Sequence, residues 1–173
     1  VHVVLGDVSN IKLTYIEDLY LAERLFQLRT LGLWDLGVSP KDISKKLYGR
    51  VVVVFGGSRG IGHEICRLAR ESGAIVYSFS RANNVDVTDY NAVQSALLDV
   101  HEKQHRIDVV VCTAGILKIE TLERSNIEDI VEQIEVNLLG SIHVAKASIP
   151  FLKETGGAII FFTSSSFSRG REN

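Results

Sequence analysis

The chain has 173 residues, a formal net charge of -2 and a hydrophobic fraction of 46%. This hydrophobic fraction can bury a core, which excludes a disordered chain. No basic stripe follows a predicted helix and no apolar run reaches the roughly 18 residues that a membrane helix needs, so the sequence predicts neither a nucleic-acid partner nor a membrane span.

The N-terminal part predicts a helix from Thr14 to about Arg29. Apolar side chains recur there at helical spacing, and Thr14 and Glu17 have the spacing of a capping box. Residues 32–40 are rich in Gly, Ser and Pro, which is typical of a linker, and a short helix is expected at residues 41–47. The first residues lack the charged segment of a secretory signal and the sequence contains no Met, so we expect a cytoplasmic piece of a longer protein.

Strands and helices alternate from residue 49 onward. Five strands are predicted, at residues 50–55, 74–79, 84–87, 107–112 and 158–162. Helices are predicted between them, at residues 61–72, 88–103 and 125–153. The first strand is a nearly continuous run of β-branched residues, which suits a strand buried on both faces. The alternation predicts an α/β fold with a doubly wound parallel sheet.

Two cysteines, Cys66 and Cys112, are present. They lie far apart in the sequence and match no metal-binding spacing. We therefore expect two buried thiols in a reducing compartment, with neither a disulfide nor a metal site.

The turn after the first predicted strand is rich in glycine. It reads Phe55-Gly56-Gly57-Ser58-Arg59-Gly60-Ile61-Gly62. Glycines let a backbone approach a diphosphate closely, and the N-terminus of the following helix offers free N–H groups and a favourable dipole. The sequence therefore predicts nucleotide contacts from Gly56, Ser58, Arg59, Gly60, Ile61 and Gly62. The alternative is a turn whose glycines serve only tight packing of helix against sheet.

The glycine spacing, GxxxGxG, resembles that of the short-chain dehydrogenase/reductase family. Three further segments resemble the family: Cys112-Thr113-Ala114-Gly115 after the fourth predicted strand, Asn137 in the long helix, and Thr163-Ser164-Ser165-Ser166 after the last strand. Phe55 stands where the family motif begins with Thr, and the segment at 112–115 keeps Ala-Gly but lacks both Asn of the family motif. The resemblance covers residues 49–173 and implies a Rossmann-like sheet, here truncated after its fifth strand, with Ala114 and Gly115 beside the cofactor.

Charge favours NADPH over NADH as the cofactor. A carboxylate at the end of the second strand would accept the ribose hydroxyls of NADH, but Ser80 and Arg81 stand there instead. Arg59 adds a second guanidinium, and Arg binds phosphate through paired donors, as a 2′-phosphate requires. The resemblance places Asp86 and Val87 beside the adenine ring. The alternative is that both arginines are solvated surface residues and Asp86 only ends a strand.

The resemblance also implies catalytic roles. In this family a Ser orients the carbonyl, a Tyr donates the proton, a Lys lowers the pKa of the Tyr, and an Asn holds a water in the proton relay. The matching residues are Asn137 and a serine that we assign to Ser165, with Ser164 as the other possibility. No Tyr-x-x-x-Lys follows Ser166, so we expect this chain to be inactive alone. The alternative is a serine-rich turn with no chemistry.

Two segments narrow the resemblance. Residues 163–171 resemble the reductase half of bifunctional CDP-ribitol synthesis enzymes, and residues 1–30 resemble the C-terminal end of their cytidylyltransferase half. The predicted domains are therefore a cytidylyltransferase remnant at 1–30, a linker at 31–48 and a reductase at 49–173.

The implied reaction is NADPH-dependent reduction of ribulose 5-phosphate, in a homo-oligomer that makes CDP-ribitol for a cell-surface polymer. Arg169 and Arg171, in a loop at the carboxyl edge of the predicted sheet, are candidate ligands of the sugar phosphate. The other readings are a reductase of another ketone, such as an acyl carrier thioester, and a non-catalytic NADP-binding module.

Overall fold

The computed structural model describes residues 14–31 and 40–164. The chain divides into two compact units, Val1–Asp42 and Ile43–Asn173. The predicted cytidylyltransferase remnant and linker fall partly outside the described residues and stay predictions. No helix within the described residues is long and apolar enough to cross a membrane.

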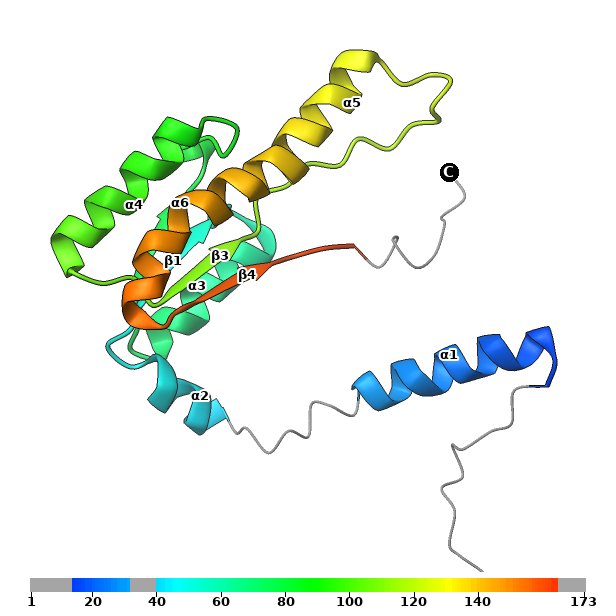
Figure 1. Ribbon diagram of the computed structural model, residues 1–173, viewed down its shortest axis with the longest axis horizontal. Coiled ribbons are helices and arrows are strands. Elements are labelled where there is room, and N and C mark those ends of the chain that lie inside the picture. The colour runs from blue at the N-terminus through cyan, green and yellow to red at the C-terminus, as the bar shows by residue number, and fades with distance from the viewer. Residues whose placement is uncertain (1–13, 32–39, 165–173) are drawn as a thin grey trace, which may run out of the picture. The chain divides into compact units, whose positions relative to one another are not determined.

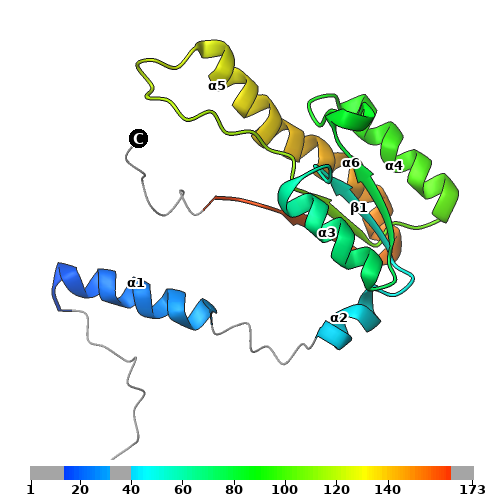
Figure 2. The ribbon, with the colours of Figure 1, turned by 180° about the vertical axis from the view of Figure 1, so that it is seen from behind.

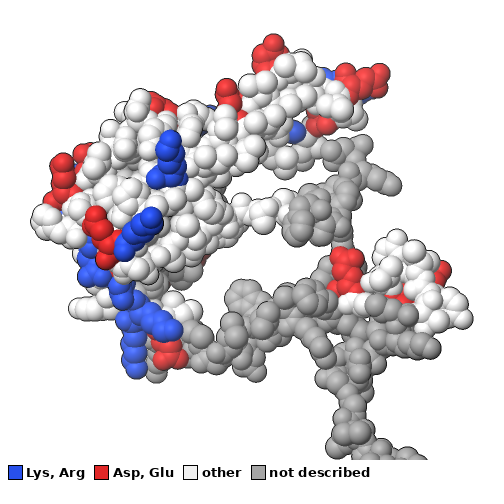
Figure 3. Space-filling model, viewed as in Figure 1, with Lys and Arg blue, Asp and Glu red and all other residues white. Residues whose placement is uncertain are grey.

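Two helices lie in the N-terminal part of the chain. They are α1 (Ile16–Leu31) and α2 (Pro40–Leu47). At the start of α1 the carboxylate of Asp18 accepts hydrogen bonds from the backbone N–H groups of Thr14 and Tyr15, at 2.7 and 2.8 Å. These bonds fix the backbone just before the helix, and the carboxylate that accepts them is Asp18, whereas the capping-box prediction used Glu17. Figure 3 shows basic side chains gathered around α2, whose last turn contains Lys45 and Lys46.

The described part of the second unit is built on a sheet of four parallel strands (Figure 1). They are β1 (Val51–Phe55), β2 (Ile75–Phe79), β3 (Val109–Cys112) and β4 (Ala158–Phe161). Their order in the sheet is β2-β1-β3-β4, and every neighbouring pair is parallel. The carboxyl ends of all four strands therefore lie at one edge, and the predicted doubly wound α/β fold is confirmed.

Helices cover both faces of the sheet (Figures 1 and 2). They are α3 (Gly60–Glu71) on one face, with α4 (Tyr90–Gln104) and α6 (Gly140–Thr155) on the other. Val51, Val53 and Phe55 of β1 belong to the core cluster that includes residues of α4 and α6, while Val52 and Val54 pack with residues of α3. Successive strand side chains point to opposite faces, so a central strand covered on both sides must be apolar throughout.

The two cysteines lie in these two cores. Cys66 on α3 and Cys112 at the end of β3 are buried free thiols, as predicted. Burial raises the pKa of the Cys112 thiol, which keeps it protonated near neutral pH. The described residues contain no cluster of three or more His, Cys, Asp or Glu side chains that could hold a metal ion.

The prediction of a strand at residues 84–87 was wrong. The chain forms a short 3-10 helix after β2, and Asn84 takes the left-handed conformation with φ +61°. The Asn83 side chain accepts a hydrogen bond from the Ser80 N–H at 2.6 Å and donates one to the Ser78 carbonyl at 2.7 Å. Local bonds of this kind compete with strand pairing. The described sheet therefore has four strands, and the predicted fifth strand is β4.

A buried carboxylate joins β1 to β3 at the amino ends of the strands. Asp108, whose side chain is 4% exposed, accepts hydrogen bonds from the Val51 N–H, from Arg50 and from Arg106, at 2.6–2.9 Å. Burial by itself raises the pKa of this carboxyl, but the bonds from Arg106, Val51 and Arg50 outweigh burial and lower the pKa to about 2. Asp108 thus stabilises the folded state in its charged form.

We expect Asp108→Asn to lower the free energy of unfolding at pH 7 by roughly 2 kcal/mol, because the charge-assisted bonds are lost. The folded pKa lies below the unfolded one, so this stabilisation is complete above the unfolded pKa, near 4, and is lost as the pH falls toward 2. Denaturant unfolding at pH 7 and pH 3 measures both effects. The exposed Asp99→Asn is the control, and a difference between wild type and Asp108→Asn that stayed constant between the two pH values would contradict the assignment.

Candidate functional site

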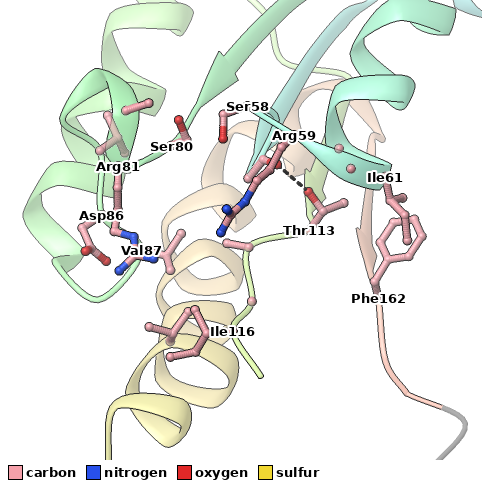
Figure 4. A pocket seen from close by; sticks show the side chains of 18 residues that line it. Ser58, Arg59, Ile61, Ser80, Arg81, Asp86, Val87, Thr113, Ile116 and Phe162 are labelled. Carbon is pink, nitrogen blue, oxygen red and sulfur yellow. Dashed lines mark hydrogen bonds between the residues drawn. The ribbon is translucent and has the colours of Figure 1, made fainter. Parts of the chain in front are cut away.

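A cavity of about 490 Å³ lies at the carboxyl ends of β1, β2 and β3 (Figure 4). Its walls come from the glycine-rich turn after β1, the segment after β2 and the loop after β3. All twelve residues predicted to contact a cofactor line it: Gly56, Ser58, Arg59, Gly60, Ile61, Gly62, Ser80, Arg81, Asp86, Val87, Ala114 and Gly115. The fold therefore brings three separate segments of the sequence together around one cavity.

Six further lining residues were not predicted. They are Ala82, Val85, Thr113, Ile116, Val136 and Phe162. Most of them are neighbours in sequence of predicted residues, such as Thr113 before Ala114 and Ile116 after Gly115. Because these side chains adjoin the predicted residues, they line the same cavity and help to give it its shape. Their position next to the motifs in the sequence could therefore have been used to predict them.

The glycines of the turn have two different roles. Gly56 has φ +90°, and a Cβ placed on it would lie 2.5 Å from the backbone nitrogen of Ala114. A Cβ on Gly62 would collide with the Thr113 hydroxyl, which itself donates to the Gly56 carbonyl at 3.2 Å. These two glycines allow the turn to pack directly against the loop after β3. Gly60, with φ +59°, has open space where a Cβ would stand, so its backbone is free for a ligand to approach.

The N-terminus of α3 faces the cavity without a side-chain cap. Arg59 is the N-cap residue in an extended conformation, and among the described residues no side chain forms a capping hydrogen bond there. Gly60, Ile61 and Gly62 all line the cavity. Free N–H groups and the helix dipole favour an anion at this point, and together with the open glycine they fit the diphosphate of a dinucleotide.

The charged residues that line the cavity are Arg59, Arg81 and Asp86. Figure 4 shows the Arg59 side chain extending into the cavity from the glycine turn and Arg81 entering it from the segment after β2. The Asp86 carboxylate is engaged locally, since it accepts hydrogen bonds from the N–H and the hydroxyl of Thr88, both at 2.9 Å. The positive charge therefore favours an anionic ligand, while Asp86 shapes the turn that carries Val87.

Asn137 lies where the predicted long helix is interrupted. The helix is divided into α5 (Ile127–Ile134), a π-helical turn (Glu135–Leu139) and α6. The Asn137 side chain accepts from the Ile116 N–H at 2.9 Å and donates to the Ile116 carbonyl at 2.8 Å, while the Asn137 carbonyl accepts from the Ser141 hydroxyl at 2.8 Å. π-Turns are frequent at functional sites. Asn137 thus holds the loop after β3 against the helix.

The remaining predicted site residues lie at the end of the described chain. Ser164 is exposed and follows β4 by a few residues. Ser165, Arg169 and Arg171 lie outside the described residues. The catalytic role of the serines and the phosphate-binding role of the arginines stay predictions.

Comparison with known proteins agrees with this geometry. The sequence model of the family described as short chain dehydrogenase matches residues 50–172. The bifunctional ribulose 5-phosphate reductase/CDP-ribitol pyrophosphorylase Bcs1 of Haemophilus influenzae is 40% identical over 172 residues, which are 99% of this chain and 36% of that protein. The 3-oxoacyl-[acyl-carrier-protein] reductase of Mus musculus is 30% identical over 64% of this chain and 54% of that protein.

A solved structure has a similar fold. The aldohexose dehydrogenase of Thermoplasma acidophilum aligns with a TM-score of 0.64 and 25% identity, over 69% of this chain and 51% of that one. This chain therefore spans about a third of the bifunctional relative and about half of the others. The glycine turn at the carboxyl end of β1 and the family match across residues 50–172 agree, and the chain belongs to the short chain dehydrogenase family.

Proposed function

We propose that the intact protein reduces D-ribulose 5-phosphate to D-ribitol 5-phosphate with NADPH, within a bifunctional enzyme that makes CDP-ribitol. One observation carries this proposal: the similarity to the bifunctional relative extends over 99% of the chain and so includes residues before the family match begins at residue 50. We accordingly assign residues 1–30 to a cytidylyltransferase domain, 31–48 to a linker and 49–173 to the reductase. The enzyme would act in the cytoplasm, and its CDP-ribitol would be used to synthesise a cell-surface polysaccharide.

The cavity residues would hold the cofactor in a defined orientation. The N–H groups at the start of α3 would bind the diphosphate, with Gly60 giving its backbone access. Arg81 and Arg59 would bind the 2′-phosphate, which NADPH carries and NADH lacks. When bound, the reduced nicotinamide supplies a hydride to the substrate carbonyl carbon.

The serine and the asparagine would act at the substrate carbonyl. The Ser165 hydroxyl would donate a hydrogen bond to the carbonyl oxygen of ribulose 5-phosphate, which orients the ketone and stabilises the negative charge that forms on this oxygen. Asn137 would position the loop after β3 through Ile116 and support the proton relay. The alkoxide oxygen formed by hydride transfer must also take up a proton. We assign no residue of this chain as the proton donor.

We expect Arg81→Ala to weaken NADPH binding by about 1.5–3 kcal/mol, the scale of a hydrogen bond between charged groups, and to leave NADH binding nearly unchanged. The reason is that the 2′-phosphate loses its bidentate partner. Fluorescence titration with both cofactors measures the effect. Arg70→Ala is the matched control, because Arg70 lies in the last turn of α3 and does not line the cavity. Equal losses for NADPH and NADH would show that Arg81 does not recognise the 2′-phosphate and would remove the charge argument for NADPH.

The substrate is tested by steady-state kinetics of the intact protein with ribulose 5-phosphate, unphosphorylated ribulose and a 3-oxoacyl thioester. We expect ribulose 5-phosphate to be preferred, and Arg169→Ala or Arg171→Ala to raise its KM roughly tenfold, about 1.4 kcal/mol, with NADPH affinity unchanged. Preference for the thioester would instead favour the function of the 3-oxoacyl reductase relative. Cofactor binding without turnover of any ketone would favour a non-catalytic NADP-binding module.

Two serine variants distinguish the catalytic hydroxyl. We expect Ser165→Ala to lower kcat roughly 100-fold, because a hydrogen bond to the developing oxyanion is lost, while Ser164→Ala retains most of the activity. Both variants should bind NADPH as the wild type does. The reverse order of effects would assign the role to Ser164, and normal activity in both would show that the serine segment has no chemical role.

A further inference from the structure

An ion-pair network links the cofactor cavity to α5. Glu132 on α5 lies 3.8 Å from the Arg81 guanidinium, measured from Oε1 to Nη1. The other Glu132 oxygen is 2.5 Å from the Lys118 ammonium, which also pairs with Asp129 at 2.6 Å. Glu132 therefore bridges two cations, one from the segment after β2 and one from the loop after β3.

The Arg81–Glu132 pair joins the segment after β2 to α5. Arg81 lines the cavity, and Glu132 lies one helical turn before Val136, which also lines it. The same helix carries Glu128 and Asp129 in its first turn, and Figure 3 shows acidic side chains gathered at this end of the molecule. A phosphate that approaches Arg81 therefore also approaches a region of negative charge.

We propose that Glu132 lowers the affinity for NADPH by competing with the 2′-phosphate for Arg81, and so limits the preference for this cofactor. This inference rests on the proposed use of NADPH. The Arg81 guanidinium has a fixed number of N–H donors, so a 2′-phosphate that binds them must displace the Glu132 carboxylate. The negative charge of Glu132 also repels the phosphate. NADH, which carries no 2′-phosphate, meets neither effect.

The network lets Arg81 leave Glu132 at little cost. Both side chains are well exposed, at 57% for Arg81 and 40% for Glu132, so the pair between them is screened by solvent. Glu132 also keeps Lys118 as a partner after Arg81 has moved, so no carboxylate is left without a counter-charge. The pair therefore tunes the affinity for the phosphorylated cofactor without preventing its binding.

The test is the Glu132→Gln variant of the intact protein, titrated with NADPH and with NADH. We expect NADPH to bind about threefold more tightly and NADH to bind unchanged, the size of an effect from one exposed charge pair. The gain should shrink at high salt, because exposed charges are screened there. Asp129→Asn is the matched control, since it removes one negative charge from the same helix and the same Lys118 contact but does not touch Arg81.

The double variant Arg81→Ala/Glu132→Gln separates the inference from the proposed cofactor. If the wild type binds NADH as tightly as NADPH, the assignment of NADPH is wrong. If the wild type prefers NADPH but Arg81→Ala keeps this preference unchanged, Arg81 does not bind the 2′-phosphate and our inference is wrong. If Arg81→Ala abolishes the preference but Glu132→Gln leaves NADPH affinity unchanged or weakens it, Glu132 does not compete and our inference is wrong. An equal gain in Asp129→Asn would also overturn it, because the effect would then come from the general charge of α5. The inference requires that the gain disappears in the double variant.

Discussion

β1 pairs with β2 along one side and with β3 along the other, and the position of the site depends on this double pairing. The connection from β1 to β2 runs through α3 on one face, while the connection from β2 to β3 runs through α4 on the other face. The chain segments that leave the three strands therefore diverge around a single space at their carboxyl ends. The core reaches this space at Val87 and Val136, which belong to the core cluster and also line the cavity.

Stability and ligand binding are located at opposite ends of the same strands. Asp108 and its two arginine partners join β1 and β3 at the amino ends, where the carboxylate is nearly buried. The charged residues at the carboxyl ends, Arg59 and Arg81, line an open cavity instead. The ion pairs at the amino ends are built around a buried carboxylate, whereas Arg81 at the carboxyl ends pairs with an exposed one, Glu132. The same residue types thus serve two purposes, according to whether their partners are buried or exposed.

The fold and the cofactor cavity were largely predictable because they follow from local patterns. The β-branched run at residues 51–55 specifies a buried strand, and the glycine spacing after it specifies the turn. Residues 84–87 misled the prediction because the Asn83 side chain, not a neighbouring strand, satisfies the preceding backbone. The contact between Arg81 and Glu132 joins segments far apart in the sequence, and no periodicity reports such a pair. The π-turn at Asn137 was equally invisible, since its residues continue the helical pattern.

The close contact of Gly56 and Gly62 with the loop after β3 has a mechanical consequence. Even a single methyl group on either glycine would collide with Ala114 or Thr113, so the turn and this loop interlock and must move as one body. The wall formed by the glycine turn and the loop after β3 is therefore rigid. The wall that carries Arg81 is anchored at Val87, which is buried and whose carbonyl contacts His143 at 2.9 Å. Residues 81–84 of this wall are exposed, and their described contacts are local turn bonds and the exposed Arg81–Glu132 pair. We therefore expect the cavity to open and close at these four residues, while its other walls stay in place.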